Sequence, residues 1–245
     1  MKVFRPGTGE RSHGKYPLPQ SPYQLKRFKY NSHYWILKFL SETNGPLKIL
    51  DVGTAEGYLG ALLKENGHRV IGIERDELLA AKARTHYEYL HVSDIEQFDF
   101  PYRDEFDFIL FADVLEHLRD PASVLSRSLK SLKPTGDIII SVPNVANIAV
   151  RLGLLFGRFD YKDRGILDRT HLRFFTLETL KKLLDECACR RRAIAPTPIP
   201  IQLVLPSTDH RFFAPLHEIH YLLVRLWKRL FSYQFVVRAA PNYAH

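Results

Sequence analysis

The sequence predicts an α/β protein with a doubly wound, mostly parallel seven-stranded sheet, helices on both faces and an antiparallel last strand. From residue 47 onward, apolar runs of strand length alternate with amphipathic segments of helix length. The runs are apolar at nearly every position, which is typical of strands buried on both faces of a parallel sheet. Acidic residues recur near the ends of these runs, and ligands of such sheets bind beyond the carboxyl ends of the strands. These residues are Asp51, Glu74, Asp94 and Asp113.

The elements follow from the pattern in chain order. Residues 1–44 are expected to form an N-terminal arm, rich in Gly, Pro, Ser and charge, and a helix over Pro22–Ser41 that Asn44-Gly45-Pro46 ends. Residues 45–245 are expected to form one larger domain. Its first strands are predicted at Leu47–Val52, Arg69–Glu74, Tyr87–Val92, Phe106–Ala112 and Asp137–Val142. Its first helices are predicted at Gly57–Asn66, Asp76–Thr85 and Pro121–Leu132.

The C-terminal part predicts one more helix, from Thr176 to Cys187, and two antiparallel strands at Arg190–Thr197 and Ser232–Ala240. A helical insertion near residues 212–231 separates these strands. Its apolar residues recur at helical spacing, and they are Leu216, Ile219, Leu222, Leu223, Leu226, Trp227, Leu230 and Phe231. Its basic residues, Arg225, Lys228 and Arg229, occupy the other side. Two interpretations stay open: a helix on a membrane surface, or one packed on the domain or on a second subunit in a homodimer.

Composition limits the classes of protein. The two cysteines, Cys187 and Cys189, are too close in sequence for an ordinary disulfide, so we expect a reducing, cytoplasmic compartment. The N-terminus has no apolar run typical of a signal peptide, and no segment has the ~20 apolar residues of a membrane span.

Charge is unevenly distributed along the chain. Residues 1–40 hold eight Lys/Arg and one Asp/Glu, residues 41–186 hold nineteen and twenty-four, and residues 187–245 hold eight and two. Basic ends around an acidic domain suit an anionic partner, such as a phosphorylated or lipid-linked substrate, a membrane surface or RNA. Solvated surface charge explains any single cluster equally well. No DNA partner is expected.

The segment Leu47–Gly60, LKILDVGTAEGYLG, predicts a buried strand, a glycine turn and a helix. Gly53 and Gly57 allow the backbone to approach a ligand closely. Glu74 follows about 20 residues later, where an acidic side chain accepts hydrogen bonds from ribose hydroxyls. The glycine pattern GxxxGxxG is neither the GxGxxG of nicotinamide-dinucleotide proteins nor a P-loop, which argues against an oxidoreductase.

Further segments in the same order extend this pattern, namely SDIEQFDF, EFDFILFADVLEHLRDP, LKPTGD, IIISVPN and GILD…HLRFFT. From about Leu47 to Cys189 the chain resembles the Rossmann-like (class I) S-adenosylmethionine-dependent methyltransferases. The resemblance is to the branch of ubiquinone-type O-methyltransferases and bacterial small-molecule methyltransferases. It implies S-adenosylmethionine as cofactor. It also implies a set of cofactor-binding residues: Asp51, Gly53, Thr54, Ala55, Gly57, Tyr58, Glu74, Arg75, Ser93, Asp94, Ile95, Ala112, Asp113 and His117. The family usually has glycine where this chain has Ala55, so the loop is expected to avoid a positive φ there.

Two histidines are candidate general bases for an acceptor that must lose a proton. His117 follows the fourth strand, and His171 lies in the segment expected to cover the acceptor. The alternative for each is a histidine that hydrogen-bonds a loop backbone.

A metal site is a weaker hypothesis. Asp113, Glu116 and His117 have i, i+3, i+4 spacing, and ubiquinone-type relatives carry a similar arrangement with a metal role. We favour the alternative in which Glu116 caps and His117 packs beneath the cofactor, so no divalent metal is expected.

Residues around His171 are candidates for holding the acceptor. Arg164, Arg169 and Arg173 suit a carboxylate or phosphate, and the equally plausible alternative is salt bridging to Asp160, Asp163 and Asp168. Tyr161, Phe174 and Phe175 line an acceptor pocket or belong to the core.

The sequence thus predicts a methyltransferase acting on a small molecule, by O-methylation of a sugar, a glycolipid precursor or an aromatic alcohol. The alternative is an RNA-binding methyltransferase-like protein that uses its basic termini.

Overall fold

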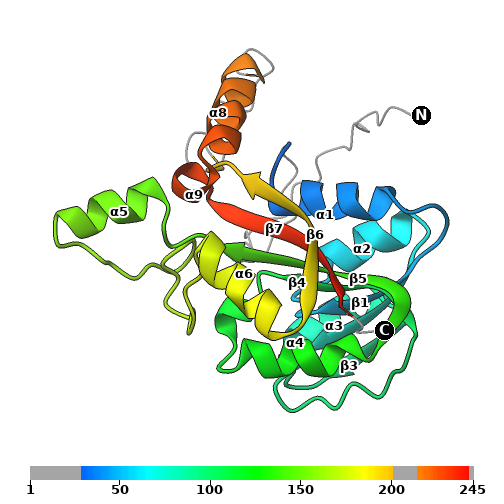
Figure 1. Ribbon diagram of the computed structural model, residues 1–245. Coiled ribbons are helices and arrows are strands. Elements are labelled where there is room, and N and C mark those ends of the chain that lie inside the picture. Colours follow the sequence, from blue (N-terminus) through cyan, green and yellow to red (C-terminus); the bar gives the residue numbers. More distant parts are fainter. Residues whose placement is uncertain (1–28, 201–213, 243–245) are drawn as a thin grey trace, which may run out of the picture.

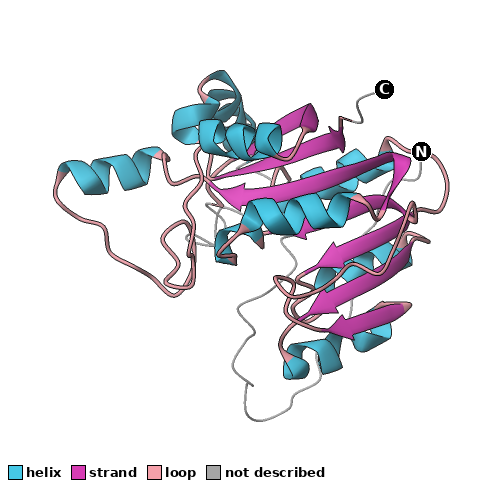
Figure 2. Cartoon of the chain, turned by 60° about the horizontal axis from the view of Figure 1, so that its bottom comes forward, coloured by secondary structure: helices cyan, strands magenta, loops and turns pink. Residues whose placement is uncertain are grey.

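Seven strands form one sheet in the order β3-β2-β1-β4-β5-β7-β6 (Figures 1 and 2). The structure is a computed structural model that describes residues 29–200 and 214–242. Strands β1 to β5 are parallel, and β7 runs antiparallel to both β5 and β6. The predicted fold class is confirmed. The strands are β1 Lys48–Val52, β2 Arg69–Glu74, β3 Tyr89–Val92, β4 Phe106–Ala112, β5 Leu132–Pro143, β6 Cys189–Thr197 and β7 Gln234–Pro241.

Two layers of helices cover the sheet. The described helices are α1 Ser32–Ser41, α2 Tyr58–Glu65, α3 Glu77–Ala83, η1 Arg84–His86, η2 Leu115–His117, α4 Pro121–Leu129, α5 Ile148–Leu155, α6 Leu177–Glu186, α8 Ala214–Leu226 and α9 Lys228–Phe231. Alternate residues of a strand point to opposite faces, so Ile49 packs with α1, α2 and α3, whereas Leu50 packs with α4 and α6. No described helix is both long and apolar enough to span a bilayer.

The N-terminal helix begins later than expected in the described part of the chain. Tyr30 has a φ of 68°, and the Asn31 side chain accepts a hydrogen bond from the Tyr34 amide (2.8 Å), so α1 starts at Ser32. The predicted helical residues 22–28 lie outside the described residues. The boundary proposed at residue 44 remains a prediction, although α1 shares one apolar cluster with α2.

Several other boundaries also differ from the prediction. The helix after β2 tightens into the 3-10 turn η1, and β3 therefore starts at Tyr89 rather than Tyr87. The helix α4 ends at Leu129, because β5 begins earlier than predicted, at Leu132. In its described residues, 214–231, the insertion predicted near 212–231 forms two helices, since Trp227 has a non-helical φ of −132° and ψ of 60°.

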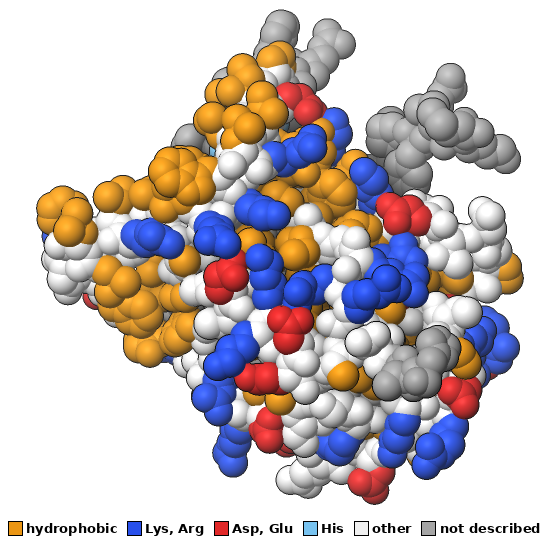
Figure 3. Space-filling view, in the orientation of Figure 1, with side chains coloured by type: hydrophobic (Ala, Val, Ile, Leu, Met, Phe, Trp, Pro, Cys, Tyr) orange, Lys and Arg blue, Asp and Glu red, His pale blue; other side chains and the backbone are white. Residues whose placement is uncertain are grey.

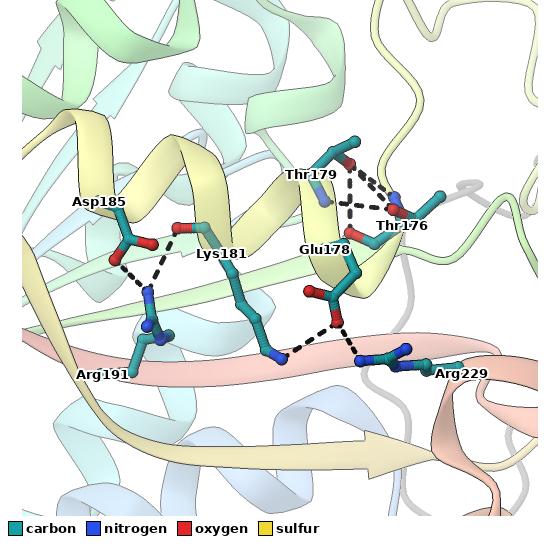
Figure 4. Close-up of polar contacts among 7 residues, drawn as sticks. All are labelled: Thr176, Glu178, Thr179, Lys181, Asp185, Arg191 and Arg229. Atoms are coloured by element: carbon teal, nitrogen blue, oxygen red, sulfur yellow. Dashed lines mark hydrogen bonds and ion pairs between the residues drawn. The ribbon is translucent and has the colours of Figure 1, made fainter.

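The helix predicted from Thr176 to Cys187 is confirmed, with these residues as its two caps (Figure 4). The Thr176 and Thr179 side chains each bond the other's backbone amide, which satisfies amides that the first helical turn leaves open. Glu178 on the same turn accepts from Lys181 and from Arg229 of α9.

Tyr87 packs beneath the sheet instead of extending β3. Its ring fills the space beside two glycines: a Cβ built on Gly60 would lie 2.2 Å from the ring, and one on Gly72 would lie 2.9 Å from it. Its hydroxyl donates to the Asp51 carboxylate (2.7 Å), and Asp51 is only 1 % exposed. Burial raises the pKa of Asp51 to about 7, and the Tyr87 hydrogen bond opposes this rise.

We expect Asp51 to make folding stability depend on pH. The folded state retains a proton that the unfolded chain releases above pH 3.8, so the contribution of Asp51 to the free energy of unfolding falls as the pH rises from 3.8 to about 7. The slope is at most about 1.4 kcal/mol per pH unit. In urea unfolding at several pH values, Asp51→Asn should therefore gain stability relative to wild type as the pH rises. A difference that does not change with pH would contradict this.

Candidate active site

Three residues of the glycine loop between β1 and α2 have a left-handed backbone conformation. Gly53 has a φ of 75° and donates its amide to the Ile73 carbonyl (2.8 Å), while Gly57, with a φ of 82°, starts α2. The expectation that Ala55 avoids a positive φ was wrong, because its φ is 47°. Such a conformation costs a non-glycine residue roughly 1–2 kcal/mol. The Ala55 amide donates to Glu74 Oε2 (2.8 Å), and this bond helps to hold the residue there.

Glu74 joins the loop to the turn after β2. Its carboxylate accepts hydrogen bonds from three backbone amides, those of Ala55 (2.8 Å), Arg75 (2.9 Å) and Asp76 (3.0 Å). The side chain is 7 % exposed, so it lies at the inner end of the loop. Three amides from two segments converge on one carboxylate, which fixes the shape of this end of the site.

Replacing Glu74 with Ala should weaken S-adenosylmethionine binding by ~1.5–3 kcal/mol, the usual value of a hydrogen bond to a charged group. The variant also loses the hydrogen bond from the Ala55 amide, which should loosen the loop and weaken binding further. Isothermal titration calorimetry measures the effect. Glu88→Ala is the matched control. Glu88 pairs with Arg69 on the surface, at the amino ends of β2 and β3, whereas Glu74 lies at the carboxyl end of β2. Equal affinities of the two variants would contradict a ribose role for Glu74.

The remaining predicted cofactor residues also lie at the carboxyl edge. The Ser93 amide donates to the Glu74 carbonyl (2.9 Å), which brings the ends of β2 and β3 together. Asp94 is exposed and accepts from the Glu96 amide (2.9 Å), whereas Ile95 is buried. Thr54 is buried within the glycine loop, and the exposed Tyr58 donates to Glu56 (2.6 Å).

Asp113 faces the neighbouring strands. It has a φ of 58°, and its Oδ1 accepts from Gln234 Nε2 (2.9 Å) and from the Ser141 hydroxyl. This places its carboxylate toward β5 and β7, following the half-buried Ala112. The group of potential metal donors that the described residues bring together contains His171 in place of Asp113.

Glu116, His117 and His171 form a cluster at the end of β4. One donor atom from each lies within 4.8 Å of the others, and the two imidazole centroids are 4.9 Å apart. Nδ1 of His117 donates to the Thr170 carbonyl (3.2 Å), and Nδ1 of His171 donates to the Ile166 carbonyl (3.1 Å). A carbonyl only accepts, so Nε2 is the basic nitrogen in both rings.

The cluster keeps His171 neutral at neutral pH. Burial lowers the pKa of His171, and the nearby His117 lowers it further. Both histidines do contact loop backbone, as the alternative interpretation expected, but each keeps its Nε2 for other chemistry. A neutral imidazole beside a buried carboxylate is suited to accept a proton.

Two of the three arginines near His171 make contacts within the chain. Arg169 pairs with Asp163 (2.7 Å), and Arg173 donates to the Arg119 carbonyl. The salt-bridge interpretation thus holds for Arg169, while Arg164 is exposed. Phe175 is buried in the core, whereas the ring of Phe174 lies 6.3 Å from that of His171. Tyr161 is 55 % exposed.

A small cavity of about 30 Å³ was not predicted from the sequence. It lies between residues 29–31, the end of β6, the start of β7 and α8, and two histidines of α8 line it. Gln234 lines the cavity and donates to Asp113, which connects the cavity to the end of β4. Burial, with Asp113 and Asp168 nearby, raises the pKa of the lining residue Tyr233 to about 12. The lining residues are Lys29, Tyr30, Asn31, Thr197, Pro198, Ile199, Pro200, His217, His220, Tyr233 and Gln234.

The fold and the site define the class of Rossmann-like S-adenosylmethionine-dependent methyltransferases. Residues 23–187 match the family model described as a methyltransferase domain, and the chain belongs to this family.

Curated relatives point to the same class. A ubiquinone biosynthesis O-methyltransferase of Aliivibrio fischeri is 31 % identical over 157 residues, which is 60 % of this chain and 65 % of that protein. One from Acinetobacter baylyi is 30 % identical over 118 residues, which is 44 % of this chain and 50 % of that protein. The chain spans 41 to 65 % of the length of the curated relatives it matches.

Solved structures share the fold. A methyltransferase from Archaeoglobus fulgidus has a TM-score of 0.60 at 19 % identity, covering 84 % of this chain and 91 % of that one. The magnesium protoporphyrin IX methyltransferase from Synechocystis PCC 6803, solved with bound SAH, has a TM-score of 0.57 at 14 % identity and covers 84 % and 80 %.

Proposed function

We propose that this protein transfers the methyl group of S-adenosylmethionine to an oxygen atom of a small molecule. The observation that carries the proposal is the meeting of two features at one sheet edge. The glycine loop, held by Glu74, lies at the ends of β1 and β2, and the histidine cluster follows β4, the neighbour of β1. The Gly53 backbone is close to the start of the histidine segment, since a Cβ there would lie 2.7 Å from Val114.

Methyl transfer from a sulfonium is an in-line displacement in which the cofactor is already activated. The protein therefore holds donor and acceptor in line, and a base is needed when the acceptor hydroxyl must lose its proton. We assign this proton transfer to Nε2 of His117 or His171. His171 suits the role because its lowered pKa keeps the imidazole neutral.

The cluster also fits a divalent ion. Glu116 would supply a carboxylate oxygen and each histidine its Nε2, a donor set that suits several divalent metals. A bound ion would polarise the acceptor hydroxyl. We favour proton transfer without metal, and dialysis against chelator is expected to leave turnover unchanged. Activity lost on chelation and restored by Mg²⁺ would assign the cluster to metal instead.

The acceptor is proposed to be a sugar, a glycolipid precursor or an aromatic alcohol. Relatives named ubiquinone biosynthesis O-methyltransferase support oxygen as the acceptor atom. The cavity lined by His217, His220 and Tyr233 has a volume of about 30 Å³, so it could admit only a small group of the acceptor. The excess of basic residues in the C-terminal part favours an anionic or lipid-linked acceptor.

Two measurements test the proposal. Calorimetry should detect binding of S-adenosylmethionine and of its demethylated product, and no binding of NAD(H). Release of the demethylated product should then be followed with phenols, sugars and lipid-linked sugars as acceptors. Failure to bind S-adenosylmethionine would overturn the proposed function, whereas turnover with RNA alone would replace the small-molecule acceptor.

A further inference from the structure

Two helical segments expose an unusual amount of apolar side chain. On and just after α5, Leu152, Leu154, Leu155 and Phe156 are 49 to 76 % exposed. On and just after α8, six of the eight apolar residues predicted as a stripe are exposed over the same range, namely Leu216, Ile219, Leu222, Leu223, Leu226 and Trp227. The other two, Leu230 and Phe231, are half-buried. The ten exposed residues are called the two-helix surface below. Among the described residues, the six exposed side chains of the stripe are therefore not covered by the body of the domain.

A different face of α8 packs on the domain. Tyr221 and Val224 are buried, and the Tyr221 ring stacks on Tyr30 with centroids 3.6 Å apart. Glu218 accepts from Lys29 (2.6 Å) and from the Tyr30 hydroxyl (2.7 Å). The exposed stripe is thus turned outward by specific contacts on the opposite side of the helix.

The two segments are joined at their bases by buried asparagines. Asn144 and Asn147, both 0 % exposed, donate to the Ser232 carbonyl (2.9 Å each). Asn147 also caps α5, and Ser232 directly follows α9. The α5 and α8–α9 segments therefore project from one fixed junction, at the ends of the paired strands β5 and β7.

The junction lies on the side of the proposed methyl-transfer site. The parallel strands point toward the side from which α5 projects (Figure 2). Figure 3 shows hydrophobic side chains gathered over α8 and α5, with Lys and Arg side chains between them. The small cavity lies on the domain side of α8, where His217 and His220 line it.

The charge around this surface is basic. Residues 148–162 and 214–231 hold six Lys/Arg and two Asp/Glu. Glu218 is paired with Lys29, and Arg229 is paired with Glu178 of α6 (Figure 4). Arg158 and Arg225 are exposed. An apolar surface with Trp, Phe and Leu that is flanked by basic side chains is typical of protein that lies on an anionic membrane.

We propose that the two-helix surface docks on an anionic lipid bilayer and presents the methyl-transfer edge to a lipid-linked acceptor. This inference rests on the proposed function and names the partner of that site. A second copy of the chain is the less favourable occupant, because a two-fold interface would bring the same basic residues together. An apolar surface beside positive charge instead matches acyl chains beneath anionic head groups.

Vesicle co-sedimentation tests the docking. Wild type should bind vesicles of phosphatidylcholine mixed with phosphatidylglycerol, bind pure phosphatidylcholine at least about tenfold more weakly, and lose binding as salt rises. Leu155→Glu/Phe156→Glu and Leu226→Glu/Trp227→Glu should each reduce binding about tenfold or more. Leu78→Glu on α3 is the matched control, since Leu78 is 78 % exposed and Leu155 is 76 % exposed. It should bind like wild type.

Other outcomes overturn the proposal. If wild type fails to bind anionic vesicles, or if Leu78→Glu reduces binding as much as the surface variants, the docking is refuted. If wild type is a dimer by light scattering and the surface variants are monomers that never bound lipid, the surface belongs to a second copy. S-adenosylmethionine binding is measured in every variant. Its retention confirms folding and separates failure of docking from failure of the proposed function.

Discussion

Gly53→Val is expected to abolish S-adenosylmethionine binding in calorimetry. Gly53 has a φ of 75°, which a β-branched residue rarely adopts, and a Cβ there would lie 2.7 Å from the Val114 side chain. The valine side chain would also occupy the space in which we propose that the loop approaches the cofactor.

Gly67→Val is the control for Gly53→Val. Gly67 has a φ of 83°, with nothing within 4 Å of an added Cβ, and it lies at the start of β2 away from the loop. The control suffers similar backbone strain and should lose stability while it keeps cofactor affinity. Affinity within a few-fold of wild type in Gly53→Val would remove the glycine loop from the cofactor site.

The second large effect is expected at the histidine cluster. Replacing the true base, His117 or His171, with Ala should lower kcat by ~10²–10⁴-fold and leave cofactor affinity near normal. Activity should be lost as the pH falls through the pKa of the base. If the base is His171, this loss begins below the usual histidine value of 6.5, because burial lowers its pKa.

His220 gives the comparison for this experiment. It lines the small cavity, and burial lowers its pKa as well. We propose that His220 contacts the bound acceptor and does not accept the proton. His220→Ala should raise KM for the acceptor and leave kcat nearly unchanged. A collapse of kcat in His220→Ala, with full activity in both cluster variants, would move the base to α8.

Local patterns predicted most of the fold. The order of strands and helices follows from apolar runs and their spacing, and the caps Thr176 and Cys187 follow from short-range chemistry. The sequence predicts Tyr87 as the first residue of β3, but its ring is used for packing against glycines of α2 and β2. No local pattern distinguishes these two uses of a tyrosine.

The parts of the site that were missed depend on distant contacts. Ala55 keeps a positive φ with the help of a carboxylate nineteen residues away. Glu116 and His117 meet His171 only because the segment after β5 folds back over the end of β4. On α8, the sequence interpretation used only the apolar stripe. The face that packs on the domain is formed instead by residues at three- and four-residue spacing, namely His217, His220, Tyr221 and Val224. Tertiary structure decides which face of an amphipathic helix is buried.

The packing of Tyr87 has a consequence for how relatives of this protein evolve. Its ring takes the volume that a side chain at position 60 would need, so positions 60 and 87 share one space. An added side chain at position 72 would meet Leu90 and Thr54 as well as this ring. Substitutions there are expected to be coupled across an alignment of relatives. Sequences with a side chain larger than glycine at position 60 should carry a residue smaller than tyrosine at position 87. In those sequences, the acidic residue at position 51 should take its hydrogen bond from another donor, since the tyrosine hydroxyl that serves it here would be gone.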